Sequence, residues 1–143
     1  MSPVPLGARP VYYPVVTSQQ PRGRRARIQL PRDLVVAFRQ GVEAGGTPGS
    51  TLIYGWITQA ARYAAAGQYQ LVPPQSSSPP TTGEQEHIDF RMSARESSEV
   101  VALLKDAGSS QRAVAAACIE AYLAAGCSPV RMSWPRRESL LAA

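Results

Sequence analysis

Side chains that can form paired hydrogen bonds recur at every second position in one short stretch of this sequence. Arg25, Arg27 and Gln29 alternate with apolar residues from Ala26 to Leu30. This spacing places the two arginines and the glutamine on one face of an extended strand. Guanidinium and amide groups suit guanine and adenine edges, and guanidinium also suits phosphate. The stretch predicts a strand with one recognition face and one core face.

A second stretch, Glu86–Met92, alternates in the same way. His87, Asp89 and Arg91 share one face, and apolar side chains occupy the positions between and after them. Asp89 departs from the basic pattern, because a carboxylate can accept a hydrogen bond from cytosine but repels phosphate.

An extended segment cannot bury its apolar face alone, so each stretch needs a partner strand. We expect Ala26–Leu30 to pair antiparallel with Ile88–Met92 of the same chain. That pairing would set the two arginines near Asp89 and Glu86. Two copies of the first strand from different chains would instead bring like charges together, which is unfavourable between cross-strand neighbours.

Both stretches are followed by helical patterns in the same phase. Leu34, Phe38 and Val42 recur every four residues, and the glycine pair ending at Gly46 suits a left-handed helix end. Leu30 to Gly46 spans 16 positions, as does the segment from Met92 to Gly108, and the two segments are offset by 62 residues. A polar start and a second helical pattern follow each, over residues 52–66 and 112–125. The spacing indicates an internal duplication.

Strand, helix, glycine, polar cap and helix in this order resemble the ribbon-helix-helix family of Arc- and MetJ-type DNA-binding proteins. The segments Leu30-Pro31-Arg32-Asp33 and Leu52-Ile53-Tyr54 resemble the Arc subgroup in particular. Two units in one chain also resemble the architecture of TraY-type accessory proteins. The resemblance covers about residues 24–66 and 86–125. It implies a mainly α fold with a two-stranded antiparallel β-ribbon, as a tandem ribbon-helix-helix pseudo-dimer.

The chain divides by composition into five segments. Units 1 and 2 are expected to pair into one domain, and the Pro-, Ser- and Thr-rich linker between them is expected to be flexible and unpacked. The segments are a Pro-rich basic N-terminal arm (1–23), unit 1 (24–67), the linker (68–85), unit 2 (86–127) and a C-terminal tail (128–143).

Charge differs strongly between the two units. The net charge of the chain is +5. Residues 21–72 carry seven arginines against two acids, whereas residues 84–127 carry four basic residues against seven acids. An acidic partner such as nucleic acid would therefore favour unit 1 and the basic arm.

These observations assign candidate contacts to double-stranded DNA. The base-contacting candidates are Arg25, Arg27, Gln29, His87, Asp89 and Arg91. The phosphate-contacting candidates are Arg22 and Arg24 in the arm, and Thr47, Gly49, Ser109 and Ser110 at the starts of the two second helices. Thr47 before Pro48 is expected to cap its helix. Capping alone would also explain the polar residues at both starts.

Two classes of function fit. The first is a sequence-specific DNA-binding protein, either a transcriptional repressor or a plasmid or phage maintenance factor, with adjacent copies on DNA. The second is a protein-interaction module, such as an antitoxin that neutralises a toxin or a docking adaptor. The sequence suggests no enzyme, metal site or cofactor. Without a membrane-spanning pattern, and with Cys118 and Cys127 too far apart along a helix for a disulfide, we expect a cytoplasmic, nucleoid-associated protein.

Overall fold

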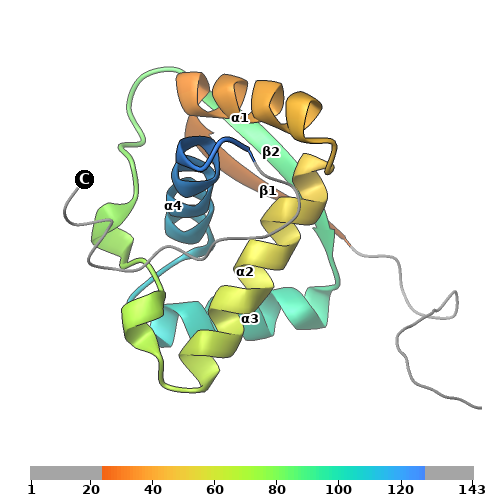
Figure 1. Ribbon diagram of the computed structural model, residues 1–143. Coiled ribbons are helices and arrows are strands. Elements are labelled where there is room, and N and C mark those ends of the chain that lie inside the picture. Colours follow the sequence, from red (N-terminus) through yellow and green to blue (C-terminus); the bar gives the residue numbers. More distant parts are fainter. Residues whose placement is uncertain (1–23, 128–143) are drawn as a thin grey trace, which may run out of the picture.

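The computed structural model describes residues 24–127. The N-terminal arm with Arg22 and the C-terminal tail lie outside this range. The described part is mostly helical and contains one two-stranded antiparallel sheet (Figure 1). In chain order the elements are β1 (Arg24–Pro31), α1 (Arg32–Gly45), α2 (Gly49–Ala65), the 3₁₀ turns η1 (Tyr69–Leu71) and η2 (Gln75–Ser77), β2 (Gln85–Met92), α3 (Ala94–Asp106) and α4 (Gln111–Ala124).

The two strands pair with each other, as the sequence predicts. β1 and β2 run antiparallel within the one chain, with Arg27 opposite Asp89 and Ile28 opposite Ile88. Alternation sends the apolar side chains to the face covered by the helices, where Leu30 is fully buried. The alternate residues Arg25, Arg27 and Gln29 of β1 and His87, Asp89 and Arg91 of β2 therefore lie together on the opposite face.

Corresponding helices of the two units begin at a constant separation. α1 begins at Arg32 and α3 at Ala94, which are 62 positions apart. α2 begins at Gly49 and α4 at Gln111, again 62 positions apart. The period read from the sequence therefore recurs in the helix boundaries.

Three aromatic rings form the centre of the core. Phe38, Trp56 and Tyr122, from α1, α2 and α4, have ring centroids 5.7–6.0 Å apart in tilted and edge-on arrangements. α4 is buried on all sides over 113–119, mostly through alanines, whose small side chains allow close packing. The buried residues of α1 are Val35, Phe38 and Gly41, whereas the predicted stripe members Leu34 and Val42 are only half-buried.

Two helices begin after a proline in an extended conformation, and one of these starts differs from the sequence prediction. Pro31 is the last residue of β1 and the N-cap of α1, because its ψ of 138° is extended rather than helical. Pro48, with ψ of 139°, takes the same position before α2, so Thr47 lies outside the helix and supplies no side-chain cap. At α3 a side chain does cap the helix, since Ser93 Oγ accepts a hydrogen bond from the Glu96 amide at 3.1 Å.

The linker packs against the domain, so the expectation of an unpacked segment was wrong. Val72 and Pro73 are buried, and the Gln75 amide donates to the Gly108 carbonyl at 2.8 Å. Arg112 of α4 donates to the Pro80 carbonyl at 2.9 Å and also to the Pro79 carbonyl. A Pro-rich backbone has few N–H donors, but its carbonyls can still be held by donors from elsewhere in the fold.

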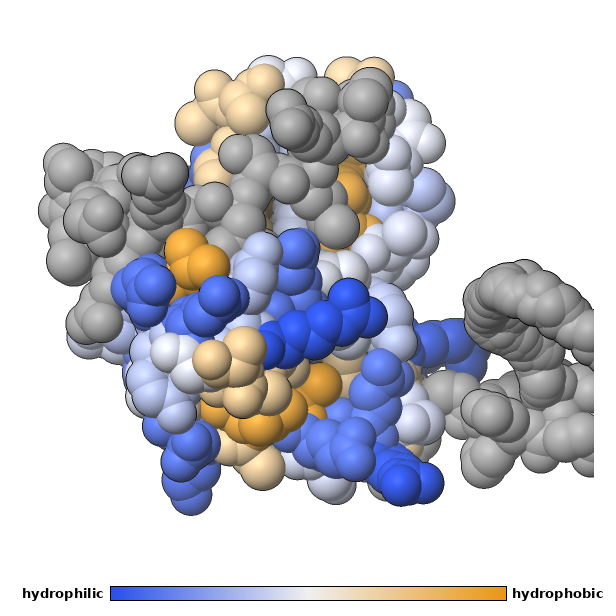
Figure 2. Space-filling model, turned by 60° about the horizontal axis from the view of Figure 1, so that its bottom comes forward, coloured by the Kyte–Doolittle hydropathy of each residue, from blue (hydrophilic) through white to orange (hydrophobic). Residues whose placement is uncertain are grey.

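Exposed large apolar side chains occur on separate elements. Val36, Tyr69 and Val101 are 38%, 41% and 49% exposed, on α1, η1 and α3. Figure 2 turns the side of α3 forward and shows hydrophilic surface around a hydrophobic patch. No helix within residues 24–127 combines the length and apolar character needed to cross a membrane. Cys118 is buried and Cys127 half-buried, and both thiols are free.

Candidate nucleic-acid interface

The six predicted base-contacting residues lie on the outward side of the ribbon. Five of these side chains are exposed and His87 is half-buried. The register arranges them as three cross-strand pairs, which we call the polar ribbon face: Arg25 with Arg91, Arg27 with Asp89, and Gln29 with His87. One strand from each unit thus contributes three hydrogen-bonding side chains to a single surface.

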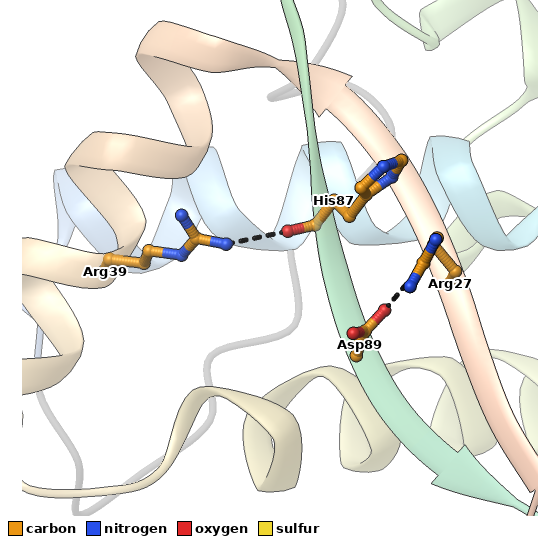
Figure 3. A network of polar contacts seen from close by, with 4 residues as sticks. All are labelled: Arg27, Arg39, His87 and Asp89. Atoms are coloured by element: carbon orange, nitrogen blue, oxygen red, sulfur yellow. Dashed lines mark hydrogen bonds and ion pairs between the residues drawn. The ribbon is translucent and has the colours of Figure 1, made fainter.

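The central pair of this face is an ion pair. Arg27 Nε donates to Asp89 Oδ1 at 3.1 Å, and the two side chains are 51% and 41% exposed. In Figure 3 the two side chains point toward one another across the ribbon. Arg25 lies opposite Arg91 and lines one hollow with Asp89, whereas the predicted proximity to Glu86 was wrong, because Glu86 lies opposite Leu30.

Two further arginines hold the outer edges of the ribbon. Arg39 of α1 donates from Nη2 to the His87 carbonyl at 2.8 Å, as Figure 3 shows. Arg112 of α4 donates from Nε to the Gln29 carbonyl at 2.7 Å. Each contact satisfies an acceptor on a strand edge that has no strand partner. The ribbon is therefore fixed to the helices at both edges while its polar face stays open.

The starts of α2 and α4 flank this face on two sides. Ser50, Thr51 and Tyr54 of α2 line a hollow together with Arg25, Asp89 and Arg91. A second hollow joins the start of α4 and the exposed side of α3 to β1. Its lining residues are Arg27, Ile28, Gln29, Val101, Lys105, Ser109, Ser110, Gln111 and Arg112.

The two helix starts differ in their capping. α2 begins at Gly49 without a side-chain cap. At α4, Ser110 Oγ accepts from the Ala113 amide at 3.1 Å. Ser109 is buried, and its hydroxyl donates to the Pro73 carbonyl. Of the two serines proposed for phosphate contact, only Ser110 therefore lies near the surface.

The phosphate candidates near β1 are only partly described. Arg24 is the first residue of β1, so it belongs to the ribbon rather than to a preceding arm. Arg22 lies outside the described residues. Thr47 is half-buried beside the start of α2.

A tyrosine at the edge of the first hollow links the two units. Tyr54 of α2 donates its hydroxyl to Glu96 Oε2 of α3 at 2.6 Å. Burial, and next the hydrogen bond to Glu96, raise the pKa of Tyr54 to about 12. The tyrosine is therefore a neutral donor near neutral pH, and it ties the start of α3 to the helix beside the polar ribbon face.

Sequence reasoning missed the roles of Arg39 and Arg112. Arg39 lies on the exposed side of α1, where an arginine is common and suggests no particular role. The position of Arg112 in the first turn of α4 gives no signal either, because Arg95 occupies the same position in α3 with 91% of its side chain exposed.

Comparison of this chain with protein-family models, curated proteins and solved structures gave no match.

Proposed function

We propose that this protein binds double-stranded DNA by inserting the polar ribbon face into the major groove, as a tandem ribbon-helix-helix pseudo-dimer. The observation that carries the proposal is the ribbon itself, with its apolar side buried and, on its open side, three cross-strand pairs of side chains that can hydrogen-bond to bases. A two-stranded ribbon fits the width of the major groove. Arginine and glutamine provide the donor and acceptor patterns that suit guanine and adenine there.

The pairing register supports the pseudo-dimer. Two units related by a two-fold axis must pair equivalent residues at the centre of their ribbon. Arg27 and Asp89 are 62 positions apart, the same separation as the helix starts, and they form the central pair. With the same separation of 62 positions, Arg25 corresponds to His87 and Gln29 to Arg91. The two-fold axis therefore exchanges the pair Arg25–Arg91 with the pair Gln29–His87.

The surroundings of the ribbon suit a phosphate backbone. The starts of α2 and α4 lie on either side of the polar ribbon face, and helix N-termini favour anions. The missing side-chain cap at Gly49 favours α2 for a backbone contact. These contacts would set the position of the protein on the duplex, while the ribbon reads the bases.

The two ends of the ribbon differ, so the proposed site has a direction. One end presents Arg25 and Arg91, and the other presents Gln29 and His87. A symmetric dimer requires a palindromic operator, but this single chain does not. A transcriptional repressor or a plasmid or phage maintenance factor acting on cytoplasmic DNA fits this chemistry, and adjacent copies could occupy neighbouring sites.

A pair of variants on the polar ribbon face tests the proposal. The probe is a labelled duplex enriched by the wild-type protein from a random pool, titrated by fluorescence anisotropy. Arg25→Ala combined with Gln29→Ala should weaken binding by roughly 10-fold or more, because each base-edge contact contributes about 1–3 kcal/mol. The affinity of the wild-type protein should also fall linearly with salt on logarithmic axes.

Arg95→Ala is the matched control, since Arg95 lies on α3 with 91% of its side chain exposed. It removes a positive charge without touching the polar ribbon face. Equal binding by the double variant and the wild type would contradict the proposal. So would the absence of DNA binding by the wild type at low salt.

A further inference from the structure

We infer that Asp89 is a positioning residue that orients Arg27 to read a guanine at the centre of the DNA site; this rests on the proposed function. The sequence alone suggests a different role for Asp89, either reading cytosine itself or repelling phosphate. The geometry points to an action through Arg27. The two residues form the central cross-strand pair of the polar ribbon face.

The atoms of the ion pair carry the inference. Asp89 Oδ1 accepts from Arg27 Nε at 3.1 Å, on the side of the guanidinium rather than at its end. A guanidinium has five N–H donors in a fixed planar fork. A partner at Nε leaves the end of the fork, with Nη1 and Nη2, for a second acceptor pair. The O6 and N7 atoms of guanine are such a pair in the major groove.

Stability alone does not explain this ion pair. The side chains are 51% and 41% exposed, and ion pairs at that exposure contribute little to folding. An arginine side chain that rotates freely must lose that freedom when it binds a base edge. Asp89 restricts this freedom before DNA arrives.

The charge of Asp89 also bears on specificity. An unpaired carboxylate facing the groove repels phosphate, so it weakens binding to every sequence alike. Pairing with Arg27 offsets that repulsion. Removing the charge of Asp89 leaves the positive charge of Arg27 unbalanced, so non-specific binding should strengthen. It also frees the Arg27 side chain, so discrimination at one base pair should weaken.

Asp89→Asn tests this, because it keeps the size of the side chain and removes its charge. The probes are the enriched duplex, the same duplex with each base pair replaced in turn, and an unrelated duplex of equal length. Wild-type protein should discriminate roughly 10- to 100-fold at one central G·C pair. The variant should lose most of that discrimination and bind the unrelated duplex more tightly.

Glu99→Gln is the matched control. Glu99 is an exposed acid on α3, paired with Arg95 at 3.9 Å, so its loss changes the net charge by the same amount. It should leave discrimination at every base pair unchanged. Because Asp89 is exposed, Asp89→Asn should keep the unfolding transition of the wild-type protein.

The same measurement in an Arg27→Ala background separates positioning from direct reading. If Asp89 acts through Arg27, Asp89→Asn should have no further effect on discrimination once Arg27 is absent. A persistent effect would show that Asp89 itself contacts a base and would overturn the inference. Full discrimination by Asp89→Asn alone would overturn it as well. Both results presuppose DNA binding by the wild type, so they differ from a failure of the proposed function.

Discussion

Substitution of Arg112 by alanine should destabilise the domain far more than removal of an ordinary surface arginine. The guanidinium of Arg112 joins three segments that are distant in sequence: α4, the outer edge of β1 and the linker. It donates to the carbonyls of Gln29 at 2.7 Å and Pro80 at 2.9 Å, and to Ser78 Oγ at 2.9 Å. It also donates to the Pro79 carbonyl and to Gln85 Oε1.

The expected magnitude follows from these contacts. A hydrogen bond from a charged group contributes about 1.5–3 kcal/mol to stability when considered alone. The contacts share one side chain, and several acceptors regain water when it is removed, so their contributions do not add. Alanine also relieves the unfavourable position of a cation at a helix start, by about 0.3–1 kcal/mol. We therefore expect a net loss of about 2–3 kcal/mol in the free energy of unfolding.

Urea unfolding of Arg112→Ala beside Arg95→Ala measures the effect. Arg95 is the second residue of α3, as Arg112 is of α4, but its side chain is 91% exposed. Arg95→Ala should change the free energy of unfolding by no more than about 0.5 kcal/mol. Hydrogen exchange should also quicken over residues 81–85 in Arg112→Ala alone. Equal midpoints for the two variants would refute the role given to the arginine in holding the linker.

Three further substitutions test the packing around the proposed interface. Tyr54→Phe removes the 2.6 Å hydrogen bond to Glu96 and should cost about 1–2 kcal/mol near neutral pH. Folding raises the pKa of Tyr54 from 10.0 to about 12, so the stabilisation from this tyrosine is complete below pH 10 and is lost between pH 10 and 12. Urea unfolding should therefore show a steeper fall of the free energy of unfolding over this pH range in the wild type than in Tyr54→Phe. Gly45→Ala would place a Cβ 2.8 Å from the Cys127 carbonyl oxygen, and thermal unfolding should show a loss of about 1–3 kcal/mol despite the helix propensity of alanine. Phe38→Ala should cost about 3–5 kcal/mol by the same measurement, because the ring is buried in the aromatic centre; an unchanged midpoint in either variant would contradict the packing described.

The paired strands could be predicted from sequence because their pattern is local. Alternation from Arg25 to Leu30, and again from His87 to Met92, fixes which side chains share a face. An apolar face on each strand then demands a partner. The register is a separate matter, since it decides that Arg25 faces Arg91 rather than an acid, and no local pattern specifies it.

The parts that sequence reasoning missed depend on contacts between distant segments. The linker composition predicted a flexible, unpacked segment, but the linker contains η1 and η2, and the carbonyl of Pro80 is held by Arg112, which lies 32 positions further along the chain. The helical pattern over 112–125 was predicted, but not that the whole stretch 113–119 is buried, which occurs because alanine side chains let neighbouring elements approach from every side. The N-cap of α2 is Pro48 rather than Thr47, because Pro48 has an extended conformation.

Selection of duplexes from a random DNA pool by the wild-type protein, read by sequencing, tests the central claim most directly. The two ends of the polar ribbon face differ, with Arg25 and Arg91 at one end and Gln29 and His87 at the other. We predict one enriched motif that has a direction and contains no inverted repeat. Recovery of a palindromic motif, or of no enriched sequence at all, would contradict the account.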